Sequence, residues 1–119
     1  MSWKGNIERL TETNNNYRKV LYTNKLQQLV IMNIPPLAEI GMERHVDTSQ
    51  FIRVEKGHGI CIISGKKYIL KEGDAVVIDP KAYHNIINTD KKQTLKLYTI
   101  YSLPVHKKGL TQKSKGEEI

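Results

Sequence analysis

Two histidines and two neighbouring oxygen-bearing side chains are the residues of this chain best suited to metal chemistry. Glu43 and His45 are two residues apart, so on an extended segment both side chains point to the same face. Gln50 opens the next apolar run, and His84 begins a much later one. Imidazole and carboxylate ligands suit iron, manganese, nickel or zinc. If these segments meet inside one fold, the side chains can converge on a single divalent transition metal.

The elements that must position these residues are short β-strands. Apolar runs rich in Val, Ile, Leu and Tyr recur every eight to twelve residues or so, with turn signals between them and no helical period. This rhythm predicts an all-β sandwich or barrel. The expected strands cover residues 17–23, 28–34, 39–45, 50–55, 60–63, 67–70, 75–78, 85–88 and 94–101.

The length of 119 residues predicts one domain and leaves little chain for a second. We assign residues 1–104 to that domain. After Pro104 the composition shifts to Lys, Gly, Ser, Thr and Glu, without apolar periodicity. Residues 105–119 are therefore expected to form an extended polar C-terminal tail that packs weakly.

The chain is basic, with 19 Lys and Arg against 12 Asp and Glu and a formal net charge of +7. Such a charge is typical of nucleic-acid binders. However, most of the basic residues are scattered lysines, whereas base readout and phosphate clamping favour arginine. We therefore interpret the charge as a solvated surface and disfavour nucleic acid as a partner.

Cys61 is the only cysteine of the chain, which excludes an intramolecular disulfide and a cysteine-based zinc site. No apolar stretch approaches the length that spans a bilayer, and the first residues lack the apolar core of a secretory signal. We expect a cytoplasmic protein that does not contact a membrane.

The spacing of the first group of residues resembles the first motif of the cupin superfamily, whose members fold as double-stranded β-helix jelly rolls. That motif contains His-x-His, then Glu, then a glycine. Here Glu43 and His45 stand at the two histidine positions, Gln50 at the glutamate position and Gly57 at the glycine.

The second cupin motif has a counterpart further along the chain. Gly73 stands at its first glycine, His84 at its histidine and Asn88 at its asparagine, while its proline and internal glycine are displaced. The resemblance covers roughly residues 39–103 and implies a small single-domain jelly roll.

The ligand positions depart from the usual cupin pattern. Glu43 replaces a histidine, and the neutral amide of Gln50 replaces a carboxylate. Glu-x-His-x4-Gln is similar to a variant found in small bacterial-type cupins, some of which carry names likening them to sugar-phosphate isomerases. The resemblance thus implies a metal site of Glu43, His45 and His84, with Gln50 as a fourth ligand or an orienting neighbour.

Two classes of function stay open on these residues. One is a metal-dependent enzyme, of isomerase or dioxygenase type, whose metal polarises a small polar substrate or binds oxygen beside it. The other is a non-catalytic small-ligand-binding or sensing cupin with a degenerate or empty metal site. No acid/base pair stands out, so the catalytic residues, the substrate and the identity of the metal are not assigned. The resemblance also implies a homodimer, since open sheet edges invite pairing.

The remaining histidines and tyrosines are given ordinary structural interpretations. His58 lies between two glycines and is expected to face solvent, while His106 belongs to the predicted tail. Tyr101 is interpreted as core or interface packing.

Overall fold

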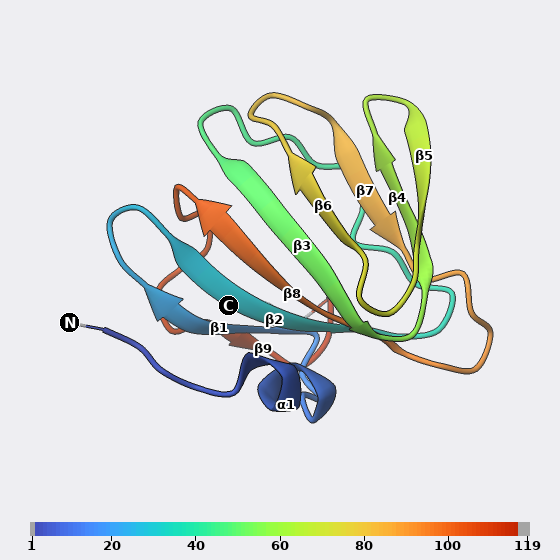
Figure 1. The fold of residues 1–119 in the computed structure, drawn as a ribbon, viewed down its shortest axis with the longest axis horizontal. Helices are drawn as coiled ribbons and strands as arrows, with labels where there is room; N and C mark the ends of the chain where they lie inside the picture. Colours follow the sequence, from blue (N-terminus) through green and yellow to red (C-terminus); the bar gives the residue numbers. More distant parts are fainter. Residues whose placement is uncertain (1, 117–119) are drawn as a thin grey trace.

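The computed structural model describes residues 2–116 and shows two facing antiparallel sheets with a short helix (Figure 1). The larger sheet has the strand order β6-β3-β8-β2-β1-β9, and the smaller one has the order β5-β4-β7. The prediction of an all-β sandwich is confirmed. In chain order the elements are α1 (Ile7–Glu12), β1 (Arg18–Thr23), β2 (Gln28–Ile34), β3 (Ser49–Lys56), β4 (Gly59–Ile63), β5 (Lys66–Leu70), β6 (Ala75–Ile78), β7 (His84–Ile87), β8 (Leu95–Ser102) and β9 (Thr111–Gln112).

The core lies between the sheets because side chains alternate along each strand. On β3, Ile52 and Val54 are buried while Phe51 and Arg53 lie on the outer face. Cross-strand pairing continues this inner face onto β8, where Leu97 is opposite Val54. The smaller sheet supplies the other half of the core, including Cys61, Leu70 and Ile86.

The segment over residues 39–45 is not the regular strand that the sequence predicts. Two isolated bridges replace a continuous ladder to β7, one from Glu39 to Ile87 and one from Glu43 to His84. Gly41 interrupts the ladder with a φ of +107°. Its N–H donates to the side-chain oxygen of Asn85 at 2.8 Å instead of to a strand carbonyl. The segment therefore runs beside β7 as an irregular edge.

Helix α1 was not expected from the sequence, because six residues are too short to show a helical period. The side chain of Asn6 caps its first turn by accepting from the N–H of Arg9. At the other end, Lys96 Nζ donates to the carbonyl of Glu12 at 2.6 Å. The helix lies against the larger sheet, on the side away from the smaller one (Figure 1). Between residues 2 and 116, no helix is long and apolar enough to span a membrane.

The C-terminal segment differs from the weakly packed tail expected after Pro104. Strand β9 pairs with β1, and Leu110 is buried in the core. The side chain of Gln28 holds the turn that leads there: its oxygen accepts from the N–H groups of Val105 and His106. Residues 105–116 therefore close one side of the sandwich, and the rest of the predicted tail, residues 117–119, lies outside the described residues.

Candidate metal site

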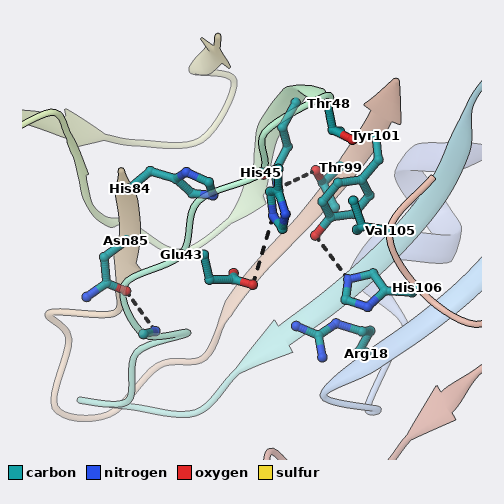
Figure 2. Close-up of polar contacts among 12 residues, drawn as sticks. Arg18, Glu43, His45, Thr48, His84, Asn85, Thr99, Tyr101, Val105 and His106 are labelled. Atoms are coloured by element: carbon teal, nitrogen blue, oxygen red, sulfur yellow. Dashed lines mark hydrogen bonds and ion pairs between the residues drawn. The ribbon is translucent and has the colours of Figure 1, made fainter. Parts of the chain in front are cut away.

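Glu43 and His84 are placed next to each other by the backbone. The N–H of Glu43 donates to the carbonyl of His84 at 2.8 Å, and the N–H of His84 donates to the carbonyl of Glu43 at 2.9 Å. Residues that exchange both hydrogen bonds in an antiparallel pair carry their side chains on the same face. His45, two residues after Glu43, shares that face, as its spacing predicts (Figure 2).

The three side chains are close enough to serve one ion. Their ligand atoms on Glu43, His45 and His84 all lie within 4.8 Å of one another. Two bonds of about 2.1 Å each span at most about 4.2 Å, so the group requires only a small adjustment to hold a metal. The 4.0 Å from His45 Nε2 to Glu43 Oε2 is too long for a direct hydrogen bond.

A backbone contact orients the ring of His84. Its Nδ1 lies 3.0 Å from the carbonyl oxygen of Ala82, which can only accept, so Nδ1 carries the proton. The lone pair is therefore on Nε2, which is buried and has no hydrogen-bond partner among the described residues. A carbonyl behind the distal ring nitrogen is the usual arrangement of a metal-binding histidine.

Gln50 lies on the inner face of β3, where its side chain is buried. Its amide nitrogen donates to Thr99 Oγ1 at 3.0 Å, which leaves its oxygen as the free end. Within residues 2–116, that oxygen is buried without a partner, as is Nε2 of His45. Buried polar atoms are nearly always satisfied in native proteins, so these unpaired acceptors fit a bound cation. Two imidazoles, one carboxylate and one amide oxygen suit iron, manganese, nickel or zinc.

Burial sets the protonation of the surrounding groups. It lowers the pKa of His45, with a further decrease from His84 and an opposing effect of Glu43. Burial also lowers the pKa of His106 to about 4, helped by the positive charge of Arg18. The pKa of the Tyr101 phenol is raised by burial and by Glu43. At neutral pH the imidazole of His45 is therefore neutral, which is the form that binds metals, and the Tyr101 phenol keeps its proton.

Sequence reasoning missed part of the surroundings of this site. Tyr101, interpreted as packing, places its ring 5.8 Å from that of His45, and its hydroxyl lies 3.3 Å from Nε2 of His106. His106 was assigned to a tail but returns to the site after Pro104. The period-two pattern over residues 94–101 could have placed Thr99 and Tyr101 on the inner face. No local signal marks His106 or Arg18, which also lies here (Figure 2).

The model of the cupin domain family matches residues 30–101 of this chain. The chain belongs to the cupin family. The first relative is an uncharacterized protein of Acanthamoeba polyphaga mimivirus, 43% identical over 108 residues, covering 87% of this chain and 67% of that protein. The second, the uncharacterized protein YrkC of Bacillus subtilis, is 35% identical over 120 residues, which cover 96% of this chain and 64% of that protein. This cupin spans about two thirds of the length of these relatives.

Solved structures confirm the fold of a small single-domain cupin. BH2720 of Bacillus halodurans superposes with a TM-score of 0.93 at 31% identity, covering 97% of this chain and 91% of that one. A predicted oxalate decarboxylase of Thermotoga maritima gives a TM-score of 0.63 at 26% identity, covering 68% of this chain and 70% of that one. KdgF of a Halomonas species shares the fold, with a TM-score of 0.68 at 19% identity. The match covers 74% of this chain and 80% of that one.

Proposed function

We propose that this cupin binds a divalent transition metal, iron, manganese, nickel or zinc, and uses it to act on a small polar molecule. Glu43, His45 and His84 are the ligands, with Gln50 as the fourth. Two observations carry the proposal. The Nε2 atoms of both histidines are buried without partners among residues 2–116, and one ligand atom each from Glu43, His45 and His84 lies within 4.8 Å of the others. Unpaired imidazole nitrogens beside a carboxylate are the donor set of such metals.

A metal held there supplies Lewis-acid polarisation of a substrate oxygen. The protein residues orient the site and its ligand. Ala82 holds the ring of His84, and Thr99 turns the amide of Gln50 so that its oxygen faces inward. The protonated hydroxyl of Tyr101, next to His45, is a hydrogen-bond donor for a ligand oxygen. This arrangement suits an isomerase-like or dioxygenase-type reaction, and the similarity to a predicted oxalate decarboxylase supports a small oxygen-rich substrate.

A second candidate is a non-catalytic cupin that senses or binds a small ligand. The neutral amide of Gln50 favours it, since it occupies the place of a carboxylate in the family motif. A neutral oxygen binds a metal more weakly than an anionic one. Screening the metal-loaded protein against sugar phosphates and small keto acids separates the two classes, because only the enzyme turns a substrate over.

The metal content of the purified protein tests the proposal directly. We expect close to one divalent ion per chain, measured by inductively coupled plasma mass spectrometry, and almost none in the His45→Ala variant. His58→Ala is the matched control, because His58 is exposed and pairs with Asp90 outside the site. Wild-type protein that takes up none of the four metals after chelation and reconstitution would exclude the proposal.

We further propose that the protein works as a cytoplasmic homodimer without nucleic acid. Strand β6 is an outer strand of the larger sheet, and its Val77 is exposed, which suits pairing between two copies. Light scattering at micromolar concentration should give twice the mass of the chain. A monomer mass would contradict the dimer.

A further inference from the structure

Arg18 lies on the inner face of the larger sheet, where arginine is unusual. Its partner in the ladder of β2 is Met32, a core residue. Its Nη1 donates to Gln112 Oε1 at 2.7 Å, and the guanidinium lies 5.1 Å from the centre of the Tyr17 ring. The next residue, Lys19, points outward and is exposed. Alternation along β1 thus sends one positive charge into the sandwich and the other into solvent.

No carboxylate between residues 2 and 116 forms an ion pair with Arg18. Within 4.0 Å, the carboxylates of that part of the chain face Arg53, from Glu55, and two histidines: His45, from Glu43, and His58, from Asp90. In addition, Nε of Arg18 is buried and lacks a hydrogen-bond partner among the described residues. An arginine that is partly buried without a carboxylate retains a donor edge for an anion.

Arg18 lies on the same side of the metal site as His106 and Tyr101 (Figure 2). Its positive charge adds to the effect of burial in lowering the pKa of His106. The rings of Tyr101 and His106 meet edge to face with centroids 5.2 Å apart, and the Tyr101 ring packs against His45 on its other side. Figure 2 shows Arg18, His106 and Tyr101 gathered on the side of the site opposite His84.

With a divalent metal bound, the site would carry a net positive charge, which favours an anionic ligand. Glu43 is the only carboxylate of the metal-ligating group, so a divalent ion keeps one excess positive charge. Arg18, on the inner face of the larger sheet, adds a second. Uncompensated charge in a low-dielectric interior is costly, and an anionic ligand relieves it.

We infer that Arg18 is a specificity-determining residue that binds the carboxylate of a small acid while another oxygen of that acid contacts the metal. This inference rests on the proposed metal site. The guanidinium is a planar fork that matches a carboxylate with two parallel hydrogen bonds. Because Nη1 is held by Gln112, the edge carrying Nε is the one that keeps an unpaired donor among the described residues.

Three compounds of nearly equal shape test the charge of the ligand: oxalate, its monoamide oxamate, and its neutral diamide oxamide. Each is titrated calorimetrically into protein reconstituted with Mn²⁺, and the metal content is measured before and after. We expect oxalate and oxamate to bind and oxamide to bind at least about tenfold more weakly, the scale of one charge-assisted contact. Oxamide binding as tightly as oxalate would overturn the inference.

Substitutions then assign the effect to Arg18. Arg18→Met should weaken oxalate binding by about 10- to 100-fold without lowering the Mn²⁺ content. Lys19→Met, which removes the same charge from the outer face of the same strand, should leave the dissociation constant unchanged. Arg18→Lys keeps the positive charge but loses the planar fork of the guanidinium, so it should weaken oxalate binding severalfold. This variant replaces Arg18→Met as the test if Arg18→Met does not fold. An unchanged dissociation constant in either Arg18 variant would contradict the assignment.

Inorganic phosphate and metal-free protein separate the remaining outcomes. If inorganic phosphate binds more tightly than oxalate and this binding depends on Arg18, the carboxylate assignment is wrong. The group that Arg18 binds would then be a phosphate ester. Wild-type protein without metal uptake would contradict the proposed function instead. In that event the metal-free protein is titrated with oxalate, and the absence of binding that depends on Arg18 would overturn this inference as well.

Discussion

Glu43 and His84 are opposite each other in a two-residue bridge, joined by backbone hydrogen bonds of 2.8 and 2.9 Å, although 41 positions separate them in the sequence. Because these bonds involve only main-chain atoms, the bridge survives a change of either side chain. The relative position of these two proposed ligands is thus a property of the backbone, whereas the proposed affinity for metal depends on the side chains. The two can be altered separately.

We expect His84→Ala to abolish metal binding and leave the fold intact. The variant removes an Nε2 ligand, whereas the bridge to Glu43 and the aliphatic core stay in place. The metal content should fall below about a tenth of the wild-type value, since a missing ligand costs more than the 10- to 100-fold of an outer contact. A circular dichroism spectrum of wild-type shape accompanies this result. Full metal content in the variant would remove His84 from the ligand set.

Gln50→Glu should tighten metal binding by roughly tenfold, because an anionic oxygen replaces a neutral one at the same place. Thr99 Oγ1 can donate to the new carboxylate, so the side chain keeps its orientation. Competition with a chromophoric chelator measures the dissociation constant. Gln93→Glu adds the same charge on an exposed residue and should change nothing. Equal affinities for wild-type and Gln50→Glu would show that residue 50 does not touch the metal.

The metal-free protein should lose stability as the pH falls from about 6.5 to about 4. Burial lowers the pKa of His106 to about 4 in the folded protein, while an unfolded histidine titrates near 6.5. Between these values the unfolded chain binds more protons, so acid favours unfolding and the stabilisation is fully present above about pH 6.5. We expect a loss of about 1–2 kcal/mol from this residue, discounted for its partial exposure.

Urea unfolding at several pH values measures this effect. His106→Gln should flatten the dependence between pH 4 and 6.5 or so, because glutamine does not titrate. His58→Gln, at an exposed position, is the control and should keep the wild-type slope. The same slope in wild-type and His106→Gln would mean that other groups cause the acid sensitivity.

Leu110→Ala should lower the free energy of unfolding by about 2 kcal/mol, the lower end of the range for a buried leucine. Leu110 is buried in the core although it follows the predicted domain boundary at Pro104. Lys108→Ala, two residues earlier and exposed, should stay within about 0.5 kcal/mol of wild-type. Urea unfolding monitors both variants. A value near zero for Leu110→Ala would show that the C-terminal segment is the weakly packed tail expected from composition.

Most strands and the proximity of Glu43, His45 and His84 followed from the sequence, because both depend on sequence patterns. Strand β2 has the bounds 28–34 that its apolar run predicts, since a strand between turn residues needs only a run of apolar and β-branched side chains. The spacing of Glu43 and His45 placed them on one face, and the family motif added His84. The short helix α1 and the irregular edge at Gly41 left no comparable pattern.

Only the tertiary structure decided what surrounds those residues. Whether Arg18 or Lys19 faces inward depends on which face of the larger sheet meets the smaller sheet, and β1 alone does not contain that information. His106 reaches the site because the chain turns back after Pro104 and Gln28, 78 positions earlier, holds the turn. Such contacts arise when distant strands bury their apolar faces together, so the charge and hydrogen bonding of the site were set by packing rather than by neighbouring residues.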